Sequence, residues 1–159
     1  MNITTIRFEG KKQRGDNHMK NMEKPRKVFI CSPFRGIAAT PEGAKENYQK
    51  NIAIAKGACR LATALGFIPY CPHLYFPRFL VDSSPDEREA GIRMGLTWLE
   101  QCDELWVIGR RISEGMKKEF ARAEELGIPA AYFVPRRTPE ERLLDAIFHP
   151  GIEFREVVW

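Results

Sequence analysis

Short apolar runs alternate with longer segments of helical periodicity, and this alternation constrains the fold of the chain more than any other feature. Strands that alternate with helices need crossover connections, which favour a mainly parallel sheet covered by helices on both faces. The sequence therefore predicts a small doubly wound α/β fold, flavodoxin-like or Rossmann-like, with four to five strands. The expected strands are 28–31, 67–71, 104–108 and 130–134, with a short extra strand in 153–159, and the expected helices are 43–65, 84–101, 113–126 and 138–148.

Prolines interrupt this pattern of strands and helices at two places. Pro69 lies inside the second strand, and because proline cannot donate to a ladder, we expect that strand at an edge of the sheet. The segment 72–85 contains three prolines and several aromatic residues. It is too apolar for an ordinary surface loop and too interrupted for a helix, so we expect a loop that covers part of the molecule.

The basic charge of the chain is concentrated at its start. The 159 residues carry a net charge of +4, but residues 1–27 contain eight basic and three acidic side chains, and the remainder is slightly acidic. We therefore expect a basic, flexible leader over 1–26 and a single domain over 27–159. A solvated leader is the expected role for this segment, and no nucleic-acid partner is expected.

Targeting and cysteine patterns indicate a cytoplasmic protein. The chain has no apolar run long enough for a secretion signal or a membrane span, so no membrane partner is expected. The cysteines are widely spaced and form no Cys-x-x-Cys pair, which indicates reduced core thiols; they are Cys31, Cys59, Cys71 and Cys102. A zinc site on Cys71 and His73 is the less favoured alternative, and we expect neither a metal nor a cofactor.

Two loops are candidates for binding a ligand. In doubly wound sheets, ligands bind beyond the carboxyl ends of the strands where strand order reverses, which in a 2-1-3-4 order is between the first and third strands. A hydroxyl and a guanidinium after the first strand can hold a phosphate, as can the free amides of a helix that begins at Ser113. The candidate binding residues are Ser32, Pro33, Phe34, Arg35, Gly36, Gly109, Ser113, Gly115 and Met116.

Glu119 is the candidate catalytic residue. It follows Ser113 by six residues and lies at the margin of an apolar stripe that includes Met116 and Phe120. An exposed helical carboxylate is the ordinary interpretation. Beside an anion-binding loop, however, a carboxylate can attack the anomeric carbon of a sugar phosphate or stabilise an oxocarbenium-like transition state.

Three motifs together resemble the nucleoside 2-deoxyribosyltransferase superfamily. They are Ser32-Pro33-Phe34-Arg35-Gly36 after an apolar strand, Trp98-Leu99-Glu100-Gln101-Cys102-Asp103 before one, and Ser113-x-Gly115-x-x-x-Glu119. The closest functional likeness is to the 2'-deoxynucleoside 5'-phosphate N-hydrolases, and the general appearance is that of uncharacterised bacterial or phage members. The resemblance covers about residues 27–134.

The resemblance implies roles for individual residues. Glu119 matches the glutamate that forms a covalent glycosyl intermediate, and the two loops match phosphate-binding segments. Gly95 stands where the family has an aspartate that assists the leaving base, so His73, Asp86 or Glu89 are the candidates for an acid or base contact. Asp103 is expected to be structural. The resemblance also implies a homodimer or a higher homo-oligomer.

The sequence thus predicts an enzyme that cleaves or exchanges the N-glycosidic bond of a nucleoside or nucleotide, as an N-hydrolase or a deoxyribosyltransferase. A non-catalytic nucleotide-binding module of the same fold is the alternative, because Gly95 departs from the family pattern. A structural protein whose leader engages a partner is a third possibility that only the charge asymmetry supports.

Overall fold

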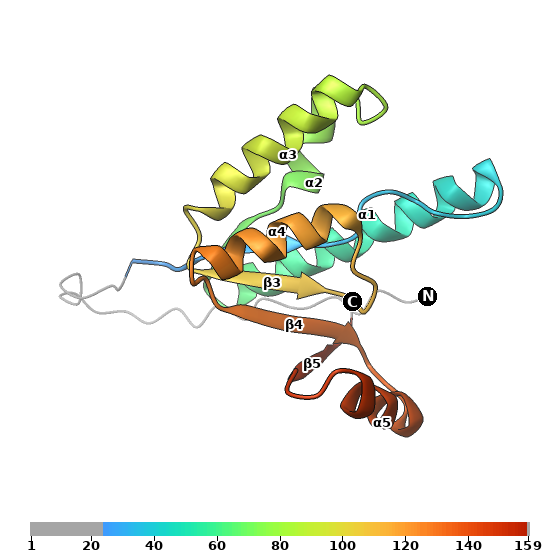
Figure 1. The fold of residues 1–159 in the computed structure, drawn as a ribbon, viewed down its shortest axis with the longest axis vertical. Coiled ribbons are helices and arrows are strands. Elements are labelled where there is room, and N and C mark those ends of the chain that lie inside the picture. Colours follow the sequence, from blue (N-terminus) through green and yellow to red (C-terminus); the bar gives the residue numbers. More distant parts are fainter. Residues whose placement is uncertain (1–23, 159) are drawn as a thin grey trace, which may run out of the picture.

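The computed structural model describes residues 24–158. Five strands form one parallel sheet in the order β2-β1-β3-β4-β5, which confirms the predicted α/β class (Figure 1). The strands are β1 Lys27–Cys31, β2 Ile68–Tyr70, β3 Glu104–Ile108, β4 Ala130–Pro135 and β5 Phe154–Val157. The helices are α1 Pro41–Ala64, α2 Pro72–Tyr75, α3 Pro85–Leu99, α4 Glu114–Glu125 and α5 Pro139–Phe148, with a 3-10 turn, η1, at Phe76–Arg78.

Strand register places two loop exits side by side. In the parallel pair of β1 and β3, Cys31 lies opposite Val107, so both strands end at the same edge of the sheet. The strand order reverses between β1 and β3, as predicted, because β2 lies on one side of this pair and β4 on the other. The segments after Cys31 and after Ile108 therefore leave the sheet next to each other, where a doubly wound fold binds ligands.

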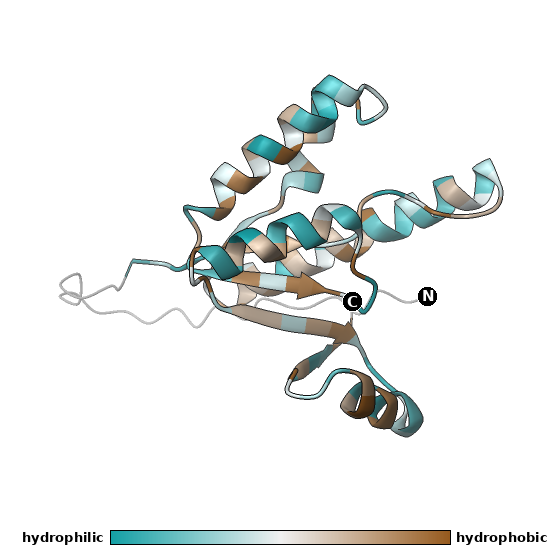
Figure 2. Ribbon diagram, viewed as in Figure 1, coloured by the Kyte–Doolittle hydropathy of each residue, from teal (hydrophilic) through white to brown (hydrophobic). Residues whose placement is uncertain are grey.

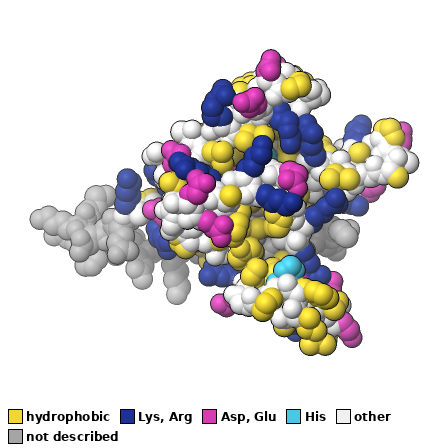
Figure 3. Space-filling model, viewed as in Figure 1, with side chains coloured by type: hydrophobic (Ala, Val, Ile, Leu, Met, Phe, Trp, Pro, Cys, Tyr) yellow, Lys and Arg dark blue, Asp and Glu magenta, His cyan; other side chains and the backbone are white. Residues whose placement is uncertain are grey.

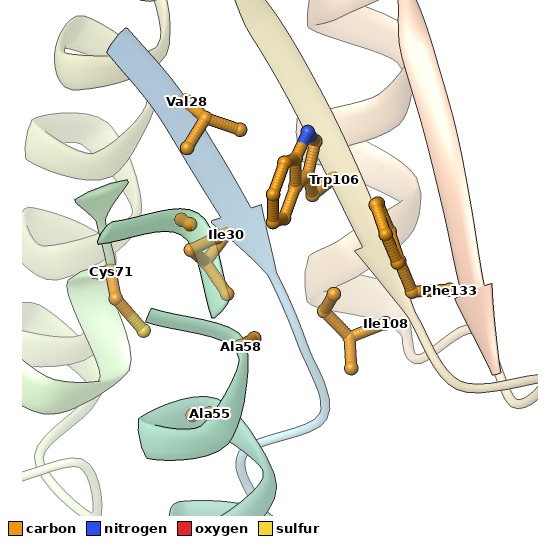
Figure 4. Packing of buried hydrophobic residues seen from close by; sticks show 9 residues of the cluster. Val28, Ile30, Ala55, Ala58, Cys71, Trp106, Ile108 and Phe133 are labelled. Atoms are coloured by element: carbon orange, nitrogen blue, oxygen red, sulfur yellow. The ribbon is translucent and has the colours of Figure 1, made fainter. Parts of the chain in front are cut away.

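The core has two layers, one on each face of the sheet. On one face, small side chains of α1 let the helix approach the strands closely, and Figure 4 shows Ala55 and Ala58 against the side chains of β1 and β3. On the other face, α3 and α4 contribute Leu99, Met116 and Ala123, which pack on the alternate residues of the same strands. Consecutive strand residues point to opposite faces, so both layers are built from the same apolar runs.

The segment after β2 differs from the prediction. It was expected to be a loop without helix, but it forms α2 and η1, each with a proline in its first turn. Proline is tolerated there because the first N–H groups of a helix have no intrahelical partner. The aromatic rings of Tyr75 and Phe76 lie against Trp98 of α3, so the segment does cover part of the molecule. The edge position of β2 is confirmed.

Several polar contacts connect α5 and β5 at the carboxyl-terminal side of the sheet. Thr138 and Glu141 form a capping box at the start of α5. Arg137 pairs with Asp145 of α5 and with Glu156 of β5, at 2.8 and 3.0 Å. α5 is strongly hydrophobic in Figure 2, and apolar side chains gather over it in Figure 3. Four of its large apolar residues are exposed, namely Leu143, Leu144, Ile147 and Phe148.

None of the helices within residues 24–158 combines the length and the apolar character that crossing a membrane requires. The predicted leader over 1–26 lies almost entirely outside the described residues. At the start of the sheet, the backbone N–H of Lys27 donates to the Asp103 carboxylate at 2.6 Å, and Asp103 N–H donates back to the Lys27 carbonyl at 2.8 Å. Asp103 thereby joins the beginnings of β1 and β3, far from the carboxyl edge, and its predicted structural role is confirmed.

Candidate active site

A cavity of about 520 Å³ lies beyond the carboxyl ends of β1 and β3. Its walls come from the β1–α1 loop, the first half of α1, the segment from α2 to the middle of α3, and the start of α4. In Figure 1, α3 and α1 extend beyond the sheet, and α4 contacts α3. The predicted site residues that line the cavity are Pro33, Phe34, Arg35, His73, Ser113, Gly115 and Glu119. The structure thus brings together the two predicted loops and the predicted catalytic carboxylate.

Glu119 lines this cavity from α4, and its carboxyl group is largely shielded from water. Its Oε2 atom is fully buried and has no hydrogen-bond partner within the described part of the chain. Burial raises the pKa of the Glu119 carboxyl to about 7, although a hydrogen bond from the Cys31 thiol opposes this effect. An unpaired buried carboxylate is costly, and such groups are concentrated at functional sites.

The start of α4 is built as the sequence predicts. Ser113 is the N-cap, and its hydroxyl accepts a hydrogen bond from the Met116 N–H at 3.3 Å. Gly115 lines the cavity, and a Cβ atom added to it would meet nothing closer than 3.9 Å. Arg111 also lines the cavity and forms no ion pair within residues 24–158. The first turn of α4 therefore offers free amides and one unpaired guanidinium to a ligand.

Ser32 and His73 form a polar contact between the β1–α1 loop and α2. Ser32 is fully buried, and its hydroxyl lies 3.4 Å from Nδ1 of His73. The His73 ring stacks on Phe34 with a centroid separation of 4.8 Å. Desolvation lowers the pKa of His73 to about 4, so the imidazole is neutral at pH 7. A neutral imidazole can accept or donate a hydrogen bond, but it is a weak source of protons at this pH.

The Arg35 guanidinium forms an ion pair with Asp82. Its Nε donates to Oδ2 of Asp82 at 2.5 Å, and its Nη2 donates to the Asp82 carbonyl at 2.8 Å. The other carboxylate oxygen of Asp82 accepts from Arg88 at 2.8 Å. All three side chains line the cavity. The guanidinium that the sequence suggests for a phosphate is therefore held by a carboxylate from the segment between η1 and α3.

Two asparagines of α1 were not anticipated from the sequence. Asn51 is buried and donates to the carbonyls of Phe34 and Arg35, at 3.3 and 3.1 Å, while Asn47 donates to the Ile37 carbonyl at 2.9 Å. Together they fix the β1–α1 loop on the helix and line the cavity. Their spacing of four residues on one helix face was the available signal.

Several predicted residues contribute outside the cavity. Gly36 is where the loop touches α1: a Cβ atom there would lie 1.8 Å from the Ala44 carbonyl oxygen, so only glycine fits. Met116 is a core residue, and Gly109 has the positive φ of 87° that ends β3. The cavity lining includes Gly95 and includes neither Ser32 nor the acid candidates Asp86 and Glu89.

No group of three or more His, Cys, Asp and Glu side chains within residues 24–158 is arranged to hold a metal ion. The four cysteines are free thiols, and all but the half-buried Cys59 are buried, as the sequence predicts. The alternative of zinc on Cys71 and His73 lacks further ligands among the described residues.

Comparisons with known proteins agree with this fold. Among solved structures, the chain is similar to the 2-deoxyribosyltransferase of the psychrotolerant bacterium Bacillus psychrosaccharolyticus, with a TM-score of 0.58 and 16% identity over 82% of this chain and 86% of that one. At this identity the likeness shows the fold, and it supports the structural relationship that the sequence motifs suggest. No curated protein matches the chain. A family model matches residues 26–133, which is more than half of the chain, and the protein therefore belongs to the family described as a domain of unknown function, DUF7768.

Proposed function

We propose that this protein cleaves or transfers the N-glycosidic bond of a nucleoside or nucleoside 5'-monophosphate, with Glu119 as the nucleophile. The observation that carries the proposal is the Glu119 carboxylate, which lines the cavity and has a buried oxygen without a hydrogen-bond partner among residues 24–158. The cavity also lies where a doubly wound sheet binds ligands. The deoxyribosyltransferase-like fold adds support.

The proposed reaction has two steps, and in each step one bond to the anomeric carbon forms and one breaks. A Glu119 oxygen attacks the anomeric carbon of the sugar, the bond to the base breaks, and the base leaves with a proton taken from an acid or from water. Water or a second base then attacks the same carbon, gives up a proton to the group or the solvent that protonated the first base, and releases the Glu119 carboxylate. Water makes the protein a hydrolase, and a second base makes it a transferase. The nucleophile must be ionised, and a pKa of about 7 leaves it partly ionised near neutral pH.

The start of α4 is the proposed contact for the sugar or its 5'-phosphate. Ser113 and Gly115 belong to its first turn, and Arg111 precedes it. Free amides and a guanidinium both favour an anion or a hydroxyl oxygen. His73 faces the same cavity as a neutral side chain, so we assign it a hydrogen bond to the substrate and no protonating role. The reaction as proposed uses groups of the protein and water, with no cofactor.

The experiment is a chromatographic search for free base. The protein is incubated with nucleosides, deoxynucleosides and their 5'-monophosphates, beside the variants Glu119→Gln and Glu124→Gln. Glu124 is the matched control, because it lies on the same helix, is exposed and does not line the cavity. We expect the parent and Glu124→Gln to release base from a subset of the panel and Glu119→Gln to release none. Equal release by folded Glu119→Gln refutes the nucleophile, and no release by the parent refutes the enzyme.

A non-catalytic nucleotide-binding module is the second candidate, and Gly95 is the observation that favours it. Gly95 is buried against the ring of Pro72 and lines the cavity, so no side chain projects from this position toward a leaving base. This module would bind nucleosides or nucleotides, as calorimetry would show, and the chromatographic search would detect no free base.

Assembly and location complete the proposal. We propose a homodimer or higher homo-oligomer that acts in the cytoplasm, within the uncharacterised bacterial or phage branch that the motifs resemble. Analytical ultracentrifugation at micromolar concentration tests the assembly: a sedimentation mass of at least twice 18.3 kDa is expected, and a mass of one chain contradicts it.

A further inference from the structure

The positive and negative side chains that line the cavity nearly cancel each other's charge. The proposed reaction does not require such a balance. The cavity lining includes three arginines, Arg35, Arg88 and Arg111, and four carboxylates, Asp82, Glu87, Glu114 and Glu119. His73 adds no charge at pH 7, because its pKa is lowered to about 4. The formal charge of the lining is therefore zero or negative, depending on Glu119. A dianionic phosphate gains little from such a cavity.

Asp82 is the carboxylate that pairs with most of the positive charge in the lining. It holds Arg35 through two contacts and Arg88 through its second oxygen, so a single aspartate occupies two of the three arginines. Its position is fixed from both sides. Arg88 belongs to α3, and the neighbouring Val81 N–H donates to the Glu87 carboxylate of the same helix at 2.6 Å. Asp82 therefore cannot move away from Arg35 without breaking contacts to α3.

A phosphate bound to Arg35 would meet this carboxylate. Because Arg35 contacts Asp82 directly, a phosphate that shares the guanidinium would lie within about 5 Å of the Asp82 oxygens, and like charges at that separation repel each other. An uncharged hydroxyl or base at the same place leaves the two ion pairs intact. The same contacts that join the β1–α1 loop to the segment before α3 thus favour a neutral ligand.

We infer that Asp82 is a specificity-determining residue that makes the cavity select uncharged nucleosides over their 5'-monophosphates. The inference rests on the proposed function and narrows its substrate class. Asp82 acts through Arg35 and Arg88, which it withholds from an anionic group.

The test is a competition between one nucleoside and its 5'-monophosphate, chosen as the best pair from the chromatographic search. The measured quantity is the ratio of kcat/KM for the monophosphate to kcat/KM for the nucleoside. We expect the parent ratio to be below one. Asp82→Asn removes the charge at nearly constant volume and should raise the ratio about tenfold, the scale of one charge pair near a protein surface. Asp82→Glu keeps the charge and should leave the ratio within about twofold of the parent.

Glu87→Gln is the matched control for charge, because Glu87 lines the same cavity and bonds a backbone N–H instead of an arginine. It should change the ratio less than Asp82→Asn does. Circular dichroism shows whether each variant folds, and Asp82→Ser replaces Asp82→Asn if the latter does not. A parent ratio above one, or a folded charge-removing variant whose ratio is unchanged or lower, overturns the inference.

Failure of the proposed function gives a different result. No protein, the parent included, would then release base from either compound. In that case calorimetric affinities of the same variants for the nucleoside and the monophosphate replace the kinetic ratio. Removal of the Asp82 charge should strengthen monophosphate binding relative to nucleoside binding about tenfold. An unchanged relative affinity overturns the inference for a binding protein as well.

Discussion

Replacing Glu119 with glutamine should stabilise the protein at alkaline pH. Burial raises the pKa of the Glu119 carboxyl from an ordinary value of 4.5 to about 7. The carboxyl is neutral in both the folded and unfolded chain below pH 4.5, and it is charged in both above pH 7. The free energy of unfolding is therefore unaffected by Glu119 below pH 4.5. It falls as the pH rises from 4.5 through the folded-state pKa of about 7. Glu119→Gln carries no charge at any pH and escapes this loss.

The size of the effect follows from the pKa difference. One pKa unit corresponds to about 1.4 kcal/mol, so the full loss is about 3 kcal/mol. Part of it has already occurred at pH 5, because the unfolded chain is then mostly ionised at this position. Between pH 5 and pH 8 the remaining loss for the parent is about 2.5 kcal/mol. The free energy of unfolding of Glu119→Gln relative to the parent should rise by that amount over this range.

Urea denaturation at pH 5 and pH 8 measures this quantity, because other titrating groups cancel in the comparison of parent and variant. Glu114→Gln is the control. Its exposed carboxylate forms a surface ion pair with Lys117 on the same helix, so its loss should cost less than about 1 kcal/mol at both pH values. A relative gain for Glu119→Gln below about 1 kcal/mol, or a loss, would refute the conclusion that this carboxylate is ionised at a cost in the folded protein.

Three further predictions address the reaction and the loops. Base release should increase as the pH rises through about 7, because the nucleophile must be ionised; a profile that is flat from pH 5.5 to 8.5 contradicts this role. Gly36→Ala should destabilise the chain by about 2 kcal/mol or more in thermal unfolding, because its Cβ would lie 1.8 Å from the Ala44 carbonyl oxygen, whereas Gly115→Ala has room and should fold normally. Thr138→Ala should cost about 1 kcal/mol through the lost capping box of α5, and an unchanged melting temperature would contradict it.

The alternation of strands and helices was readable from the sequence because it depends on local properties. The buried runs at 28–31 and 105–108 are continuous and apolar, which strands covered on both faces require. Pro69 marked the edge strand, and Ser113 marked the start of α4, since both effects act through the residue's own backbone. The helix in 72–78 was missed because its prolines were interpreted as breaks, although they occupy first turns.

The sequence by itself determined the order of strands and helices along the chain, the two loops at the carboxyl ends of the strands and the presence of a carboxylate near these loops. Only the tertiary structure decided which partners those side chains have. Asp82 lies 47 residues from Arg35, and Asn51 lies 17 residues from the Phe34 carbonyl that it holds. No periodicity reports such contacts, because they form between different elements once the sheet has brought them together. The pKa of Glu119 likewise depends on tertiary structure, because the packing of α4 against β1 buries the carboxyl and brings it to the Cys31 thiol.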